Sequence, residues 1–318
     1  MFGQEPDAGT LHETAKKFMR SGDWSNAILV LNKALAKDPG NISIKKDLAL
    51  TKYYQRDFAG AREQVVELLE NAEADVQAYQ IAGNVYKALD ELKDCERMYR
   101  KGLKTFPESG ALYAEFGELL WMQQNPDCIN QWLTGIEKDP GYAANYYHAA
   151  KVRYAQGAMV WAILYGEIFI NIESYSRRTA ETKTMLFEAY KQYFSGANVK
   201  NNTKQSPFIE EVSKILNKHQ SVITSGITTE SLIMLRSRFI LDWQKTSAEK
   251  YPYRLFDHHL QLLQEGLFEA YSYWIFEAAS DLNNYERWMK QNPNPYKNFT
   301  RFQQSKLFKI PPGQHYIK

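Results

Sequence analysis

The sequence has little of what marks several large classes of protein. Only two of its 318 residues are cysteines, Cys95 and Cys128, so a disulfide framework is excluded. The apolar stretch from Ala155 to Gly166 is closed by Glu167. It falls well short of the roughly 18 to 20 apolar residues that cross a bilayer. We therefore expect no transmembrane segment.

The N-terminus also lacks the basic and apolar regions of a secretory signal. The sequence predicts a cytoplasmic location, or an exported, periplasmic one if a signal peptide was removed before Phe2. These two alternatives stay open.

Motifs of catalytic sites are missing as well. The sequence has no Gly-x-x-x-x-Gly-Lys-Ser/Thr, Gly-x-Gly-x-x-Gly or Gly-x-Ser-x-Gly motif, and its six histidines form no His-Glu-x-x-His pair. The nearest group to a metal cluster is Asp257-His258-His259. Adjacent residues of a helix point about 100° apart, so these two rings do not converge easily. We expect no enzyme activity, no metal and no cofactor.

What the sequence does have is a repeat of about 34 residues. Small residues recur at positions 27, 61, 95, 128 and 162, and each is preceded by another at 15, 49, 83, 117 and 150. Pro39, Pro107 and Pro140 stand at the ends of three units, where they would end a helix. This phase predicts stacked helical hairpins in which Cys95 and Cys128 take the place of a buried alanine.

One unit carries the clearest motif, Tyr79-x-x-Ala82-Gly83-x-x-Tyr86 followed by Cys95-x-x-x-Tyr99, Gly102 and Pro107. This pattern resembles the tetratricopeptide repeat, or TPR. The resemblance implies an all-α fold, a right-handed α-α superhelix (solenoid) of helix hairpins. It covers residues 8–175 as five units, which are 8–41, 42–75, 76–109, 110–142 and 143–175.

From residue 176 to 318 the phase fades, but the pattern stays helical. We expect degenerate repeats or capping helices over 178–194, 207–219, 229–243, 255–263, 268–279, 281–291 and 296–307, with a loop over 197–206. The ending Ile310-Pro311-Pro312-Gly313-Gln314 predicts an extended tail. A similar ending occurs on bacterial TPR proteins that are exported with a cleaved signal.

The resemblance also implies a binding surface. In TPR proteins the first helix of each unit lines a concave groove that holds a protein or peptide segment. Phase alone assigns eleven residues to this groove, namely Lys16, Arg20, Lys46, Tyr53, Asn84, Lys87, Glu118, Trp121, Tyr147, Lys151 and Tyr154. They suit an extended peptide with carboxylates and apolar side chains. For any one of them, the alternative is a solvated lysine or an aromatic that packs between helices.

The dicarboxylate clamp of chaperone-binding TPR domains is not expected in this protein. That clamp requires Lys and Asn four residues apart in one first helix. Asn84 is preceded by Gln80 at that spacing, and Lys46 is followed by Leu50. The C-terminus of a chaperone is therefore not a favoured ligand.

Two alternatives concern the C-terminal part. Residues 1–175 carry 19 Lys+Arg against 24 Asp+Glu, and residues 176–318 carry 20 against 13, for a total charge of +2. A basic tail with interleaved aromatics could bind an anionic surface or single-stranded nucleic acid. More often such aromatics pack onto the domain, so nucleic acid is not the favoured partner.

The other alternative is a ligand-binding or enzymatic site around His258, Trp274 and Arg301. The oligomeric state is not indicated.

Overall fold

The computed structural model describes residues 5–196, 206–305, 307–311, 313, 314 and 316. The chain forms two compact units, residues 1–131 and 132–318. We call them the N-terminal unit and the C-terminal unit. The division cuts the fourth predicted repeat and leaves the fifth with the C-terminal helices. The predicted repeat boundary at residue 175 therefore stays a prediction.

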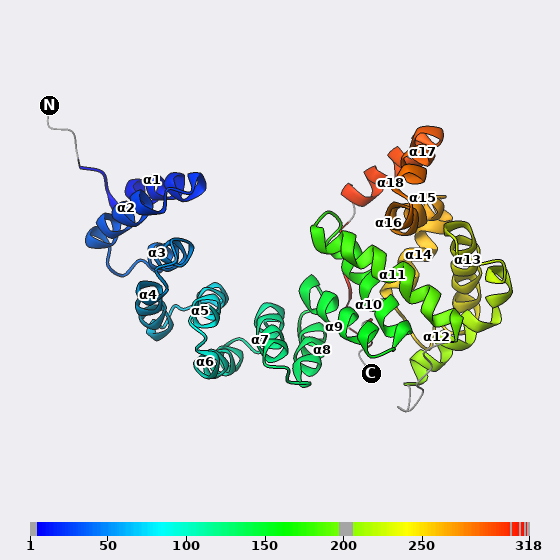
Figure 1. Cartoon of the computed structure of the whole chain (residues 1–318), viewed down its shortest axis with the longest axis horizontal. Helices are drawn as coiled ribbons and strands as arrows, with labels where there is room; N and C mark the ends of the chain where they lie inside the picture. The colour runs from blue at the N-terminus through cyan, green and yellow to red at the C-terminus, as the bar shows by residue number, and fades with distance from the viewer. Residues whose placement is uncertain (1–4, 197–205, 306, 312, 315, 317–318) are drawn as a thin grey trace. The chain divides into compact units, whose positions relative to one another are not determined.

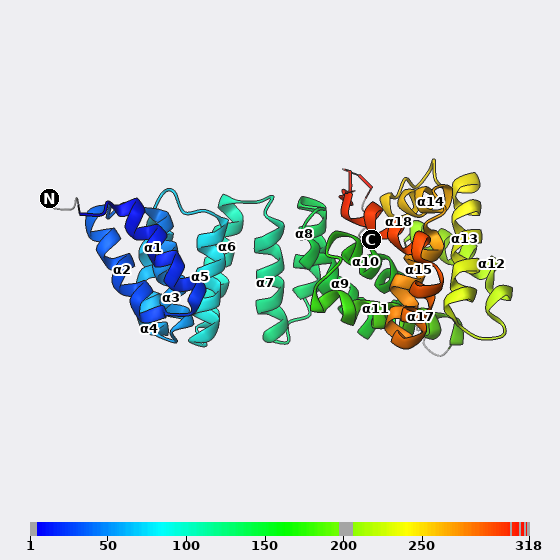
Figure 2. The same cartoon turned by 90° about the horizontal axis from the view of Figure 1, so that it is seen from above.

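The N-terminal unit consists of helical hairpins (Figure 1). Each predicted repeat holds a first and a second helix joined by a short turn. The helices are α1 (Ala8–Ser21), α2 (Trp24–Lys37), α3 (Ile42–Tyr54), α4 (Phe58–Glu70), α5 (Val76–Ala88), α6 (Leu92–Thr105) and α7 (Gly110–Met122), and α8 (Cys128–Lys138) crosses into the C-terminal unit. Figure 2 shows the helices of this unit from the side, as a stack of hairpins.

Short polar side chains start most of these helices. A side chain accepts a hydrogen bond from a backbone N–H of the first turn at Asp7, Asp23, Asn41, Asp57, Asp75 and Ser109. Such caps satisfy N–H groups that have no partner inside the helix. Short turns at Gly22-Asp23 and Asn125-Pro126-Asp127 separate α1 from α2 and α7 from α8.

The turn inside each hairpin repeats one backbone conformation. Positive φ angles occur at Gly22 (75°), Arg56 (67°), Asp90 (58°) and Gln124 (56°), which are 34 residues apart. This left-handed conformation ends the first helix and suits glycine better than other residues. Only the first of the four turns uses glycine, so the other three hold a less favoured residue.

Adding a glycine at this turn position and removing one are expected to change stability in opposite directions. Arg56→Gly is expected to raise the free energy of unfolding by about 0.5–1 kcal/mol, because it removes the steric cost of a left-handed non-glycine residue. Gly22→Ala is expected to lower it by about 1 kcal/mol. An added Cβ at Gly22 meets only Trp24, at 4.0 Å, so the loss would come from the backbone. Urea unfolding of both variants checks this, and equal signs would contradict it.

The small residues of the repeat allow helices to approach closely. An added Cβ at Gly83 would lie 2.5 Å from Cζ of Tyr99, and one at Gly102 would lie 2.7 Å from Cδ1 of Tyr79. Cys95 and Cys128 are both buried, and burial raises the pKa of the Cys95 thiol to about 12. The predicted role of these positions as buried small side chains is therefore confirmed.

The described residues of the C-terminal unit form helices and connecting loops, with no strand among them. Its helices are α9 (Ala143–Ala155), α10 (Met159–Ile172), α11 (Arg177–Ser195), α12 (Pro207–Lys218), α13 (Thr229–Thr246), α14 (Arg254–Gln264), α15 (Phe268–Ser272), α16 (Ala278–Ser280), α17 (Leu282–Gln291) and α18 (Pro293–Ser305). Helix α10 is the most buried of them and packs against α9, α11, α12 and α14 (Figure 1).

Two elements differ from the expected pattern. The helix predicted over 268–279 is interrupted by a π-helical turn, Tyr273–Glu277. Helix α18 begins at Pro293 instead of Tyr296. A proline is accepted in the first turn of a helix, where its missing N–H would have no partner. Within the described residues, no helix is both long and apolar enough to span a bilayer.

Candidate functional site

The outward positions of α1, α3, α5 and α7 form what we call the first-helix face of the N-terminal unit. Two of the predicted groove lysines on this face each form an ion pair with a carboxylate at the next first helix, since Asp75 is the N-cap of α5 and Glu115 lies on α7. Nζ of Lys46 lies 2.6 Å from Oδ2 of Asp75, and Nζ of Lys87 lies 2.9 Å from Oε2 of Glu115. Glu118, another predicted groove residue, lies 3.8 Å from Lys87.

The ion pair of Lys87 is partly buried, and this affects its charge. Burial by itself would lower the pKa of Lys87, but the carboxylates of Glu115 and Glu118 outweigh it and the pKa is raised. The lysine therefore stays charged and is neutralised by its neighbours. This part of the face is less basic than the sequence suggests.

The remaining predicted residues of the N-terminal unit lie at or near the surface. Lys16 is paired with Glu13 on its own helix at 2.9 Å, and Arg20 is exposed. Tyr53 packs against Phe58, with ring centroids 5.7 Å apart. Trp121 is 56% exposed. Asn84 is half-buried, and among the described residues the structure shows no side-chain hydrogen bond from it.

In the C-terminal unit the predicted groove residues of α9 contact α11. The hydroxyl of Tyr147 donates to Oε2 of Glu181 at 2.8 Å, and Nζ of Lys151 donates to the same hydroxyl at 3.2 Å. Nε2 of Gln192 donates to the Tyr154 hydroxyl at 2.5 Å. These side chains therefore contribute to helix packing, the alternative that the sequence left open.

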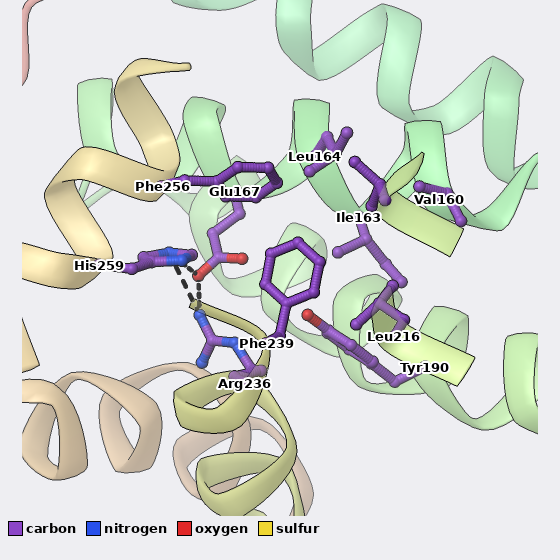
Figure 3. Close-up of a pocket in the computed structure, with 11 residues that line it drawn as sticks. Val160, Ile163, Leu164, Glu167, Tyr190, Leu216, Arg236, Phe239, Phe256 and His259 are labelled. Atoms are coloured by element: carbon purple, nitrogen blue, oxygen red, sulfur yellow. Dashed lines mark hydrogen bonds and ion pairs between the residues drawn. The ribbon is translucent and has the colours of Figure 1, made fainter. Parts of the chain in front are cut away.

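Sequence reasoning missed a buried polar cluster in the C-terminal unit. Oε1 of Glu167, on α10, accepts hydrogen bonds from Arg236 on α13, from Nε2 of His259 on α14 at 2.9 Å and from the hydroxyl of Tyr271 on α15 at 3.0 Å. Figure 3 shows the carboxylate pointing at His259 and Arg236. One side chain thus joins four helices that are distant in sequence.

The charges of this cluster are mutually stabilised. Burial would raise the pKa of Glu167, but Arg236 and His259 hold it at about 2. Burial lowers the pKa of His259 below its usual 6.5, although Glu167 opposes the shift. At neutral pH the carboxylate is therefore ionised and the imidazole is neutral, with its proton on Nε2 where it can donate to Glu167. A carboxylate this acidic is a poor proton donor at neutral pH.

A small cavity lies beside the cluster. Its volume is about 20 Å³, and its lining is mostly apolar, with Phe239, Leu216 and Val160 among the residues opposite Glu167 (Figure 3). One water needs roughly 10–15 Å³ on this measure. The cavity has room for a water molecule and not for a metabolite. The arrangement supports a structural role of the cluster.

The trio predicted in the C-terminal part is not brought into one site. His258 is buried among the rings of Tyr271, Phe302 and Phe308. Trp274 is buried, with Nζ of Lys183 3.6 Å above its ring. Arg301 is exposed on α18. None of these three lines the cavity, and the described residues contain no group of three or more potential metal ligands.

The aromatics of the basic C-terminal segment face inward. Trp288, Phe299 and Phe302 are buried, whereas Arg287, Lys290, Lys297 and Arg301 are exposed. Single-stranded nucleic acid is bound by aromatic rings that are open to stacking. The segment therefore shows the arrangement in which aromatics pack onto the domain and cations remain in water.

The N-terminal unit is built of helix pairs, most of them capped by a short polar side chain. Each pair has a left-handed residue in its turn, and these residues are 34 positions apart. The fold is of the tetratricopeptide type. No protein-family model and no curated protein sequence matches the chain.

Solved structures, two of them described as those of TPR proteins, align with the chain at low sequence identity. A TPR protein from Parabacteroides merdae is 16% identical, with a TM-score of 0.45, over 81% of this chain and 98% of that one. YrrB, described as a TPR protein with an unusual peptide-binding site, is 16% identical with a TM-score of 0.39, over 56% and 92%. Human IFIT1, solved as a dimer with m7Gppp-AAAA, is 15% identical with a TM-score of 0.43, over 80% and 64%.

Proposed function

We propose that the protein is a non-catalytic scaffold that binds an extended segment of another protein on the first-helix face of its N-terminal unit. The observation that carries this proposal is the exposure of large apolar side chains at the ends of first helices. Tyr54 at the end of α3 is 52% exposed, and Trp121 and Met122 at the end of α7 are 56% and 55% exposed. Exposed aromatic and methionine side chains are enriched where proteins bind partners.

The charges on this face refine the chemistry of the ligand. Lys46 and Lys87 are neutralised by carboxylates at the next first helix, so they offer little net charge to an acidic peptide. The amide of Asn84 can both donate and accept a hydrogen bond, which suits the peptide backbone. The ligand that fits best is an extended segment with apolar or aromatic side chains. Its affinity should depend only weakly on salt, because few unpaired charges contribute.

Selection from a library of phage-displayed random peptides tests this function without a known partner. We expect the wild-type protein to enrich peptides with aromatic or aliphatic anchors. Asn84→Ala and Trp121→Ala should each weaken binding of an enriched peptide about 10-fold or more, as for central residues of an interface.

Leu29→Ala is the matched control for these variants. Leu29 lies on α2, a second helix, and is 53% exposed, so it resembles Trp121 in exposure but not in position. Its affinity should stay within about twofold of wild type, since most peripheral truncations change binding little. Equal losses in Leu29→Ala and Trp121→Ala, or no enriched peptide, would refute the proposal.

A further inference from the structure

The residues described beyond α18 pack against the C-terminal unit without forming a helix. We call residues 307–316 the tail, of which 307–311, 313, 314 and 316 are described. Its described residues follow α18 and form no helix. It is held at two points, which are separated by a tight turn.

The first point of attachment is Arg254, at the start of α14. Its Nε donates to the backbone carbonyl of Lys309 at 3.1 Å. Its guanidinium lies 5.2 Å from the centre of the Phe308 ring, and that ring packs edge-on against His258 at 5.1 Å. Arginine over an aromatic face, combined with a hydrogen bond to backbone, fixes both the position and the direction of the segment.

The turn separates the two attachments. The N–H of Gln314 donates to the carbonyl of Pro311 at 3.2 Å, and Gly313 has a φ of 77°. A hydrogen bond of this kind and a left-handed glycine are features of a β-turn. Beyond it, Tyr316 lies against α10 and α12.

The second point of attachment is Tyr316. Its ring stacks on Phe208, at the start of α12, with centroids 4.1 Å apart and planes 12° from parallel. Tyr253 and Tyr251 lie 5.8 and 6.0 Å away, and the buried hydroxyl of Tyr165 donates to the backbone carbonyl of Tyr316 at 3.3 Å. We call Tyr165, Phe208, Tyr251, Tyr253 and Arg254 the tail-binding surface.

The tail contacts this surface as a peptide ligand contacts a receptor. Two of its backbone carbonyls accept hydrogen bonds from side chains of the surface, and two of its aromatic rings are held by stacking. Since the described residues of the tail form no helix or strand, their release breaks no secondary structure. Leu307, at the root of the tail, is 82% exposed and so does not attach the tail to the unit.

We propose that the tail-binding surface is a recognition site for this chain's own C-terminal segment. The tail covers this surface within its own chain (in cis) and can bind the same surface of a second copy (in trans). Cis binding dominates in the intact protein, because a short connection gives an effective concentration in the millimolar range. Trans binding requires an acceptor whose own tail is absent. The second copy is the occupant that fits, because its tail carries the same turn and the same two aromatic residues.

Binding of a labelled synthetic peptide of residues 306–318 tests the site. A chain truncated after Ser305 should bind this peptide at least about 10-fold more tightly than the full chain, in which the tail competes. The peptide with Tyr316→Ala should bind the truncated chain about 10-fold or more weakly, as expected for an aromatic anchor. A truncated chain that folds but does not bind, or equal binding by the full chain, would overturn the proposal.

If the truncated chain does not fold, the full chain with Tyr316→Ala replaces it as the acceptor, since it keeps every other residue. It should bind the wild-type peptide more tightly than the unmodified full chain does. Equal binding by these two full chains would also overturn the proposal.

Native mass spectrometry of a mixture tests occupation by a second copy. Full-length Arg254→Ala has a weakened surface and an intact tail, and the acceptor chain has an intact surface without a competing tail. We expect a one-to-one complex in the mixture and none in either chain alone. If the acceptor binds the peptide but forms no complex with the Arg254→Ala chain, binding to a second copy is refuted. If the complex persists when the Arg254→Ala chain also carries Tyr316→Ala, the tail does not mediate it.

Discussion

Replacing Glu167 by Gln is expected to lower the free energy of unfolding of the C-terminal unit by about 3–5 kcal/mol, the cost of breaking a buried ion pair by removing one partner. Gln keeps the size of the side chain but leaves the guanidinium of Arg236 buried without its counter-ion. Arg236 lies among the rings of Phe268, Tyr271 and Phe276, which cannot replace a carboxylate. Urea unfolding followed by circular dichroism measures the loss.

Two further variants make this prediction specific. Glu249 is exposed, and Glu249→Gln should change the free energy of unfolding by no more than about 0.5 kcal/mol. The double variant Glu167→Gln, Arg236→Met removes both charges and should be more stable than Glu167→Gln alone. If Glu167→Gln and Glu249→Gln have equal effects, the cluster does not hold the unit together.

The same carboxylate predicts the response of the unit to acid. Its pKa is about 2 in the folded protein, against an ordinary value of 4.5, so the unfolded chain binds the proton more readily. The stabilisation from ionised Glu167 is therefore present above about pH 4.5 and is lost as the pH falls from there through about 2. The wild-type protein should lose stability over this range with a slope that Glu167→Gln reduces.

Gly83→Ala is expected to destabilise the N-terminal unit by about 1–3 kcal/mol, the usual effect of overpacking a core. The added methyl group would lie inside contact distance of the Tyr99 side chain, which is fully buried and cannot move aside. Elsewhere in a helix, replacing glycine by alanine stabilises by about 1 kcal/mol. Gly83→Ala is therefore expected to lower the free energy of unfolding, whereas helix propensity alone would raise it.

Gly9→Ala is the matched control, since Gly9 also lies in a first helix but an added Cβ there meets only Oδ1 of Asp7, at 3.6 Å. It should be neutral or stabilising. Tyr99→Phe removes the hydroxyl nearest to residue 83, so Gly83→Ala should cost less in that background. A neutral Gly83→Ala would mean that the helices of the third hairpin are not held at the separation described.

The sequence predicts the N-terminal helices well because the constraint on them is local and repeats. A small residue recurs about every 34 positions, and Asp, Asn or Ser stands before most of the helices. A left-handed turn residue recurs inside each hairpin. The third hairpin, α5 and α6, lies where the Tyr79 motif places it. The C-terminal helices were predicted from their apolar stripes alone, so π-helical Tyr273–Glu277 and the early start of α18 were missed.

The buried cluster could not be predicted in the same way. Glu167 was visible as the one charge that closes an apolar stretch, which is the available signal that it needs a buried partner. That partner, Arg236, lies 69 residues further on, in a part of the chain without a repeat. The charge around the predicted groove lysines could not be predicted for a related reason. Asp75 caps the start of α5 and Glu115 lies on α7, so these carboxylates contact Lys46 and Lys87 only after the helices stack.

Hydrogen–deuterium exchange of the intact protein with and without a selected peptide tests the central proposal most directly. We expect slower exchange in α3, α5 and α7, with little change in α2 and α4. In the C-terminal unit, α12 and α14 should exchange as in the free protein, because the tail occupies their surface. Protection confined to α12 and α14, or to second helices, would contradict binding on the first-helix face.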